Sequence, residues 1–135
     1  MTGSLVYLDS SAIVKLVVRE PESPALFDWL AARPERISSA VARVEVPRAL
    51  RRAGAFTATG RRRAREVLDR IALLPVDRPI FDAAGGFGPP GLRLLDAIHL
   101  ATALSVGADL AGLVTYDERL AAVAARSRID VWAPA

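Results

Sequence analysis

The chain has 135 residues and a mass of 14.4 kDa, which predicts a single domain over residues 1–135. Hydrophobic residues make up 52% of it and charged residues 24%, a globular composition that argues against disorder. The formal net charge of +3 suggests an anionic partner such as nucleic acid, and the absence of cysteine excludes a disulfide scaffold, a cysteine zinc site and a thiol nucleophile.

Apolar residues alternate or recur every three to four positions along the chain, and this spacing locates the secondary-structure elements. In chain order, the expected elements are a strand at 5–8, a helix ending near 18, a helix at 25–32, a strand at 36–39, a helix at 41–52, a turn at 54–60, a helix with the apolar residues of 64–74, an edge strand at 74–77, a helix at 79–84, a loop at 85–91, a helix at 92–106, a strand at 113–116, a helix ending near 126 and a strand at 130–132. Pro47 is expected to kink its helix or to limit the first part of it. Strands separated by helices imply crossover connections, and hence a parallel sheet with helices on both faces.

The N-terminus and the most apolar stretch both predict a protein without a membrane segment. Residues 1–4 carry no positive charge and Asp9 interrupts the first apolar run, so we expect no signal peptide. Residues 94–114 contain Asp96, His99 and Asp109, too many polar groups for a lipid-facing span. We therefore expect a cytoplasmic protein that has no membrane partner.

Four acidic residues lie where the predicted sheet would bind a ligand, because ligands of open parallel sheets sit at the carboxyl ends of the strands. Asp9 and Asp117 follow predicted strands. Glu45 lies in the helix after the second strand, and Asp96 in the first turns of the helix after the Gly/Pro loop. Each acid also has an ordinary explanation. Asp9 and Asp117 fit as helix N-caps, Asp96 as a complement to its helix dipole, and Glu45 as the surface partner of a nearby arginine.

The surroundings of two of these acids favour a shared site. Glu45 and Asp96 lie among apolar neighbours, where an unpaired charge is costly. Carboxylates that converge repel one another and raise each other's pKa unless a cation neutralises them. Acids without a histidine or cysteine cluster select a hard divalent ion, so the sequence predicts Mg²⁺ or Mn²⁺ as the cofactor.

Four segments of the chain, in this order, resemble the PIN domain, the nuclease domain of VapC-type toxins. They are Leu5–Ala12, Ser38–Ala49, Leu95–Ala103 and Val114–Leu120. The resemblance extends over essentially the whole chain. It implies an α/β fold of three layers, α/β/α and PIN-like, with a mostly parallel central sheet of four to five strands.

The same resemblance implies the activity and the residues that carry it. The expected activity is metal-dependent hydrolysis of RNA phosphodiester bonds by an endoribonuclease, the toxin of a toxin–antitoxin pair. The expected catalytic residues are Asp9, Glu45, Asp96 and Asp117. The first, third and fourth of these acids would hold the metal, and Glu45 would orient or deprotonate the attacking water or help with a second ion. Ser10 and Thr115 would orient carboxylates or water.

Basic residues concentrate in one part of the chain. Eight arginines fall between Arg48 and Arg70, where Glu66 and Asp69 are the only acids. These two acids pair with arginines four residues before them, but the run Arg61, Arg62 and Arg63 exceeds what the pairs neutralise. The run would guide RNA or dock an acidic antitoxin segment. A solvated face explains this run equally well, and the arginine-rich codon usage of a GC-rich genome is the ordinary explanation of the net positive charge as a whole.

His99 lies three positions after Asp96 and is the one histidine of the chain. We expect it to be a packed or capped helix residue, with contact to a substrate phosphate as the alternative. The resemblance further implies a VapB-like antitoxin as partner, whose tail would place an Arg or Lys among the acids, and a homodimer.

Two other functions fit parts of the pattern. A phosphatase or phosphotransferase would place a second Asp two residues after Asp9, where the chain has Ser11. A non-catalytic binding module, PIN-like or receiver-like, stays open as the alternative from another class. A receiver would need an acidic pair after the first strand and a late lysine, whereas the one lysine is Lys15. A degenerate nuclease would have lost one of the four acids, and all four are present.

Overall fold

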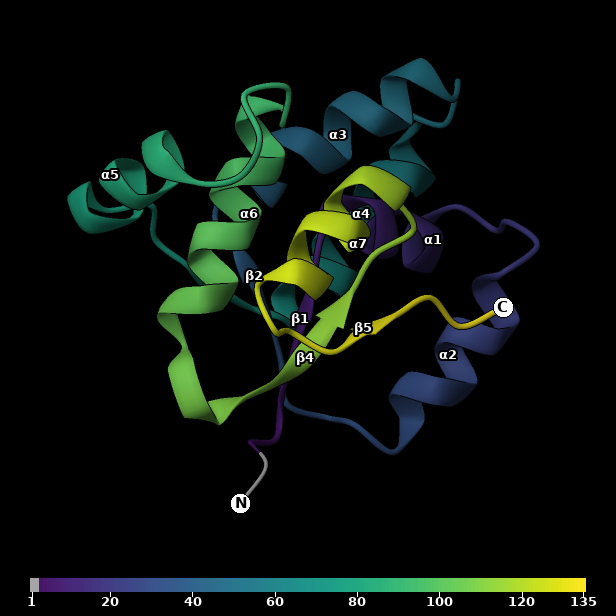
Figure 1. Cartoon of the computed structure of the whole chain (residues 1–135). Coiled ribbons are helices and arrows are strands. Elements are labelled where there is room, and N and C mark those ends of the chain that lie inside the picture. The colour runs from purple at the N-terminus through teal and green to yellow at the C-terminus, as the bar shows by residue number, and fades with distance from the viewer. Residues whose placement is uncertain (1–2) are drawn as a thin grey trace.

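Five short strands form one parallel sheet in the computed structural model, which describes residues 3–135. The strands are β1 (Leu5–Leu8), β2 (Arg36–Ser39), β3 (Ala72–Leu74), β4 (Leu110–Val114) and β5 (Val131–Trp132). Their order across the sheet is β3-β2-β1-β4-β5, and each neighbouring pair is parallel. The chain therefore begins at the centre, extends through β2 and β3 to one edge, and then adds β4 and β5 on the other side of β1 (Figure 1).

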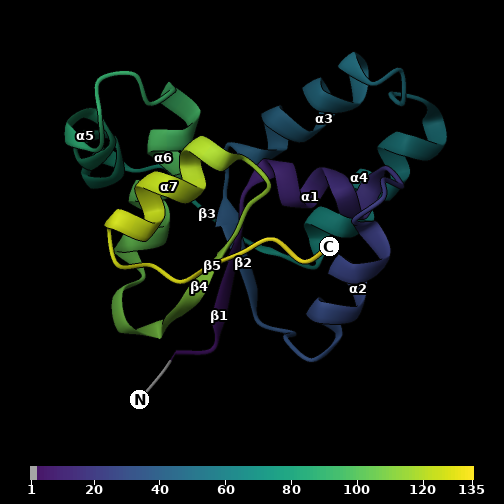
Figure 2. The same ribbon diagram turned by 45° about the vertical axis from the view of Figure 1, so that its right-hand side comes forward.

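Seven α-helices cover the sheet within residues 3–135. They are α1 (Ser10–Val17), α2 (Ser23–Ala31), α3 (Ala42–Arg52), α4 (Ala58–Asp69), α5 (Arg78–Gly86), α6 (Leu94–Ser105) and α7 (Glu118–Arg126), and the short 3₁₀ helix η1 (Gly107–Asp109) precedes β4. Figure 2 shows α1 to α4 on one side of the sheet and α5 to α7 on the other. The three-layer α/β/α class and the parallel sheet predicted from the sequence are confirmed.

The central strand β1 is held from both faces, which fixes the position of its carboxyl end. Successive side chains of a strand point to opposite faces of the sheet. Val6 and Leu8 pack into the core beneath α1 to α4, whereas Tyr7 packs with Leu100 and Leu113 in the core beneath α6 and α7. All three residues of β1 after Leu5 are buried. The residue that follows this strand therefore has little freedom to move.

Helix α3 runs through Pro47 to Arg52, so of the two expectations for this proline the one that it limits the first part of the helix is wrong, and the kink stays a prediction. A proline in a helix interior removes one backbone hydrogen bond and costs about 3 kcal/mol. Ala42, Val46 and Leu50 lie on one face of α3 and are completely buried. Their packing against α1 and α4 outweighs the lost hydrogen bond and keeps the helix continuous across the region that presents Glu45.

Three predicted boundaries are also wrong, each for a local reason. The edge strand lies at Ala72–Leu74 rather than at 74–77, because Pro75 has no N–H to continue the ladder. The loop predicted at 85–91 begins only after Gly86, since α5 continues through both glycines. Strand β4 begins at Leu110, where it pairs with β1, and ends at Val114 instead of extending to residue 116. Residues 115 and 116 are thereby free to turn toward the end of β1.

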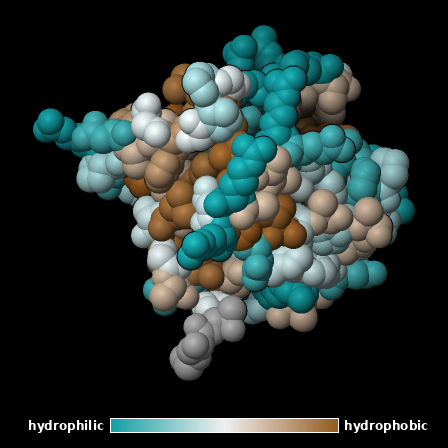
Figure 3. Space-filling view, viewed as in Figure 1, coloured by the Kyte–Doolittle hydropathy of each residue, from teal (hydrophilic) through white to brown (hydrophobic). Residues whose placement is uncertain are grey.

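The surface mixes apolar and charged side chains. In the space-filling view of Figure 3, apolar side chains gather around α6 and α7, and hydrophilic side chains cross them. Leu94 and Leu95 at the start of α6 are 75% and 39% exposed. Within residues 3–135, no helix is both long enough and apolar enough to cross a membrane.

Gly112 provides a direct test of how β4 and β5 pack. A Cβ atom on Gly112 would overlap the indole ring of Trp132 and approach the carbonyl oxygen of Asp130 to 2.7 Å. We predict that Gly112→Ala lowers the free energy of unfolding by about 1–3 kcal/mol, because the ring and the β5 backbone must shift. Gly85→Ala is the control: its Cβ has open space in α5, so this change is expected to stabilise the helix slightly. Urea unfolding followed by circular dichroism measures both, and equal stability of the two variants would contradict this packing.

Candidate active site

The four candidate acids gather at the point where the order of the strands reverses. Strands β1 and β4 lie side by side there, and a crevice outside their carboxyl ends is the usual ligand site of such sheets. Asp9 follows β1 directly, and Asp117 comes three residues after β4. Glu45 reaches the crevice from α3 and Asp96 from α6, which cover opposite faces of the sheet. All four line one cavity of about 800 Å³.

Asp9 is the most deeply buried of these acids, with 3% of its surface exposed. It is the N-cap of α1, as its ordinary explanation predicts: Oδ1 accepts hydrogen bonds from the Ala12 N–H at 3.0 Å and the Ser11 hydroxyl at 2.6 Å. Oδ2 accepts a third bond from the Thr115 hydroxyl at 2.5 Å. Burial raises the pKa of Asp9, and the bonds from Ser11, Thr115 and Ala12 oppose that rise without cancelling it.

Thr115 joins the first acid to the last. Its hydroxyl donates to Asp9 and accepts the Asp117 N–H at 3.0 Å. Asp117 is the N-cap of α7, also as expected for a cap, with Oδ1 accepting from the N–H groups of Arg119 and Leu120 at 2.9 and 3.0 Å. The two capping aspartates are therefore tied together at the ends of neighbouring strands. The orienting role expected for Thr115 stays a prediction, and these two hydrogen bonds are the contacts through which it would act.

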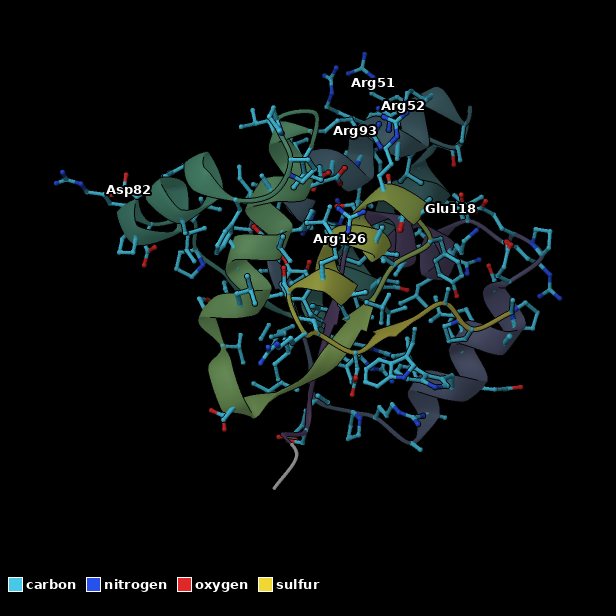
Figure 4. The ribbon with its side chains drawn as sticks, viewed as in Figure 1. Arg51, Arg52, Asp82, Arg93, Glu118 and Arg126 are labelled. Carbon is cyan, nitrogen blue, oxygen red and sulfur yellow. The ribbon has the colours of Figure 1, made fainter. Side chains whose placement is uncertain are left out.

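Asp96 lies in the first turn of α6, with 14% of its side chain exposed. Burial and the negative charges of Asp117 and Asp9 raise its pKa, while the nearby Arg93 guanidinium acts in the opposite direction. Arg93 lies 3.4 Å from Asp96 through Nε and donates to Asp117 at 2.6 Å through an η nitrogen. Figure 4 shows Arg93 at the end of the molecule where α6 and α7 begin. One cation thus bridges two of the converging carboxylates.

Glu45 is held by a different set of groups. Its Oε1 accepts from the Ser10 hydroxyl at 2.7 Å and lies 2.6 Å from His99 Nε2. Burial raises the pKa of Glu45, but the hydrogen bond and charge of His99, the Ser10 bond and the charge of Arg52 outweigh burial and leave the pKa lowered. The carboxylate is therefore ionised at neutral pH. Both hydrogen bonds fall on the same oxygen, and the structure gives Oε2 no partner among residues 3–135.

His99 is buried to 1% exposure, so the packed histidine expected from the sequence is present. Its Nδ1 lies 2.7 Å from the Tyr7 hydroxyl, and the two rings meet edge to face at 5.7 Å. Burial raises the pKa of Tyr7, which keeps its hydroxyl protonated. The two ring nitrogens of His99 thus contact the Tyr7 hydroxyl on one side and the Glu45 carboxylate on the other. This histidine therefore connects the core of the sheet to a candidate catalytic carboxylate.

Several site residues were not found by sequence reasoning. Ser11 was noted only as a missing second aspartate, yet its hydroxyl donates to Asp9 and accepts the Tyr116 N–H at 2.9 Å. The bond from His99 to Glu45 was also missed, although the spacing of three from Asp96 placed the histidine on the right helix face. Arg93 was missed entirely, and its own spacing of three from Asp96 is the signal that would have found it.

The arginine run predicted to meet RNA or an antitoxin lies apart from the acids. Arg61, Arg62 and Arg63 are exposed on α4, and none of them lines the cavity. Arg61 lies over the ring of Phe56, 5.4 Å from its centre. Any ligand of this run would contact the molecule outside the acidic cavity.

The donor set fits a hard divalent cation, although the acids are not arranged around one. Within residues 3–135, no three His, Asp or Glu side chains stand together in a way that would hold a metal ion. Asp96 and Asp117 instead contact Arg93. All four acids line one cavity, and carboxylate oxygens are the ligands that Mg²⁺ and Mn²⁺ prefer. The residue types therefore suit such an ion, but Arg93 would have to leave Asp96 or Asp117 before the ion could bind there.

Comparisons with known proteins agree on one family. A family model described as PIN domain matches residues 6–126. The protein named ribonuclease VapC46 from Mycobacterium tuberculosis is 52% identical over 129 residues, covering 96% of this chain and 97% of the relative.

Two solved structures share the fold at low identity. The crystal structure of Mycobacterium tuberculosis VapC20, described as a toxin that cleaves the sarcin–ricin loop, superposes with a TM-score of 0.71 at 15% identity, over 87% of this chain and 93% of that one. The structure of VapBC2 from Rickettsia felis bound to a promoter DNA fragment has a TM-score of 0.72 at 11% identity, over 97% and 99% of the two chains.

The raised pKa of Asp96 predicts how its neutralisation changes stability. An acid whose folded-state pKa is raised stabilises the fold at low pH, and this contribution is lost as the pH rises through the folded-state pKa. We therefore expect Asp96→Asn to melt at a higher temperature than the wild type at neutral pH in the absence of metal, and the difference to shrink toward pH 4.

Asp82→Asn is the matched control, because Asp82 is an exposed aspartate on α5 that meets only Arg78, at 3.9 Å (Figure 4). Its melting temperature should follow that of the wild type at every pH. Thermal melts over this pH range measure both variants, and a lower melting temperature for Asp96→Asn at neutral pH would contradict the account of like-charge repulsion.

Proposed function

The chain belongs to the PIN domain family, and from this premise we propose that it is a ribonuclease that hydrolyses RNA phosphodiester bonds as the toxin of a toxin–antitoxin pair. The relative that is 52% identical along nearly all of both chains is named a ribonuclease. The observation that carries the proposal is that four carboxylates from four separate elements line one cavity. Asp9 and Asp117 also cap helices, whereas Glu45 and Asp96 accept no backbone hydrogen bond in the described residues and are held by side chains instead.

A divalent cation completes this proposal. Asp9, Asp96 and Asp117 would hold Mg²⁺ or Mn²⁺, since all three line one cavity and, within residues 3–135, no cysteine or methionine lines it with them. When bound, the cation would supply positive charge to the transition state and acidify a water molecule. Arg93 contacts two of the three acids and would release at least one of them. The hydroxyls of Ser11 and Thr115 each donate to one oxygen of Asp9 and so fix the orientation of its buried carboxylate.

Glu45 is the acid we assign to the attacking water. Ser10 and His99 hold its Oε1, which leaves Oε2 to accept a hydrogen bond from water in the cavity. Its lowered pKa keeps the carboxylate ionised, the state in which it orients a water molecule or takes its proton. We assign His99 as a positioning residue, because it contacts Glu45 and only 1% of its surface is exposed.

The proposal includes two protein partners. A VapB-like antitoxin would inhibit the toxin, as the similarity to a VapBC structure supports. A basic side chain from its tail would meet the same acids that Arg93 now bridges, and its acidic residues would meet Arg61, Arg62 and Arg63. We also propose a homodimer acting in the cytoplasm, for which the exposed apolar side chains around α6 and α7 offer contact area (Figure 3).

Cleavage of RNA by the purified protein tests the activity. We predict that the wild type cleaves RNA in the presence of Mg²⁺ or Mn²⁺, that chelation abolishes cleavage, and that Asp96→Asn reduces the rate by about 100-fold or more because a ligand to the cation is lost. Asp82→Asn should cleave at the wild-type rate. Asp96→Asn protein as active as the wild type would contradict the site, and a wild type without any cleavage would leave the binding module as the better reading.

A growth assay distinguishes a toxin from a ribonuclease that is harmless to the cell that expresses it. Expression of the wild type alone should arrest growth, and coexpression with its cognate antitoxin should restore it. Asp96→Asn, expressed at the same soluble level, should be tolerated alone. If cells that express soluble wild-type protein grow normally, the protein is not a toxin, and that part of the proposal is wrong.

A further inference from the structure

Three basic side chains line the acidic cavity, and two of them are already engaged. Lys15 lies 3.4 Å from Glu20 and 2.9 Å from Glu22, with 11% of its side chain exposed. Its ammonium also lies over the ring of Tyr116, 4.7 Å from the centre. Arg93 bridges Asp96 and Asp117. Neither side chain is available to a ligand unless it first leaves its acidic partners.

Arg52 is the third basic residue of the cavity, and its guanidinium has no acidic or hydrogen-bonding partner in residues 3–135. It stands at the C-terminal end of α3, seven residues after Glu45, so both project from the same helix face about 10 Å apart along the axis. Figure 4 shows Arg52 and Arg93 at the same end of the molecule. The cavity therefore has, on its α3 side, a cation that forms no ion pair or hydrogen bond within residues 3–135, although its charge helps to lower the pKa of Glu45.

We propose that Arg52 binds a phosphate of the RNA strand beside the one that is cleaved, and so sets the path of the substrate along α3. This inference rests on the ribonuclease activity proposed above. A guanidinium presents N–H donors in a planar fork that matches two phosphate oxygens, and it carries its charge at every physiological pH. Because Arg52 is separated from the acid cluster by two turns of α3, the phosphate that it binds is a flanking one.

The alternative ligand of Arg52 is an acidic segment of a protein partner. The phosphate is favoured because Arg52 lines the same cavity as the four acids, and a substrate whose bond is broken there must extend out of the cavity in both directions. Arg61, Arg62 and Arg63 do not line the cavity and are placed to meet a ligand only farther away. Among the arginines without an ion pair in residues 3–135, Arg52 is therefore the one that an RNA strand leaving the acidic cavity would meet first.

Neighbouring Arg51 supplies a matched control. It lies on the same helix turn, is also exposed and carries the same charge, but it does not line the cavity and lies over the ring of Phe56 at 5.8 Å. We would measure the binding of a fluorescent single-stranded RNA of mixed sequence by anisotropy at several salt concentrations. Arg52→Gln and Arg51→Gln would each be made in the Asp96→Asn background, which prevents cleavage. Steady-state cleavage would be measured for the same changes in the wild-type background.

We expect Arg52→Gln to weaken RNA binding about tenfold, to lower the slope of log affinity against log salt by about one, and to raise KM more than it lowers kcat. Arg52→Lys should recover part of the affinity because the charge is retained. Arg51→Gln should change binding less than twofold, since it removes the same charge outside the cavity.

Unchanged RNA affinity in Arg52→Gln would overturn the inference while leaving the ribonuclease intact. Equal losses in the Arg51 and Arg52 variants would also overturn it, because a general loss of positive charge would then explain both. Loss of antitoxin binding in Arg52→Gln with unchanged RNA affinity would assign the residue to the protein partner instead. A wild type that neither binds nor cleaves RNA would overturn the proposed function together with the inference.

Discussion

The site depends on the hydrogen bonds that hold the buried carboxylate of Asp9. A charge with 3% exposure is costly unless it is compensated, and here the compensation comes from the start of α1 and from the residue after β4. The bond from Thr115 is made between residues 106 positions apart in the chain. It is possible only because β1 and β4 are neighbours, although the chain builds β2 and β3 between them. The stability of the sheet and the geometry of the site are therefore linked through one side chain.

The other constraint is that carboxylates gathered in one cavity repel one another unless a cation neutralises them. The structure meets it in two ways. Arg93 bridges Asp96 and Asp117, and His99 with Ser10 holds Glu45 in its charged form. The ion pairs of Arg93 can open readily, since 63% of the Arg93 side chain is exposed to solvent. The second is anchored in the core through Tyr7. A divalent ion would therefore compete with Arg93, whereas Glu45 would keep its partners through the reaction.

The sequence predicted the acids more readily than their partners. An aspartate directly after an apolar run, as in Asp9, is visible in one local pattern, and the parallel sheet then follows from alternating strands and helices. The bridge from Arg93 to Asp117 spans 24 residues and depends on how α6 and α7 pack, which no local pattern encodes. Likewise, Pro47 predicts a disturbed helix by propensity alone, and only the burial of its neighbours in the folded core explains why α3 continues.

Titration calorimetry with Mn²⁺ shows whether these carboxylates form one cation site that Arg93 occupies when no metal ion is bound. We predict that the wild type binds Mn²⁺, that Asp96→Asn loses most of this binding, and that Arg93→Ala binds the ion more tightly than the wild type because the competing guanidinium is gone. Arg126→Ala, at the far end of α7, should bind like the wild type. Equal Mn²⁺ affinity of the wild type, Asp96→Asn and Arg93→Ala would contradict the claim.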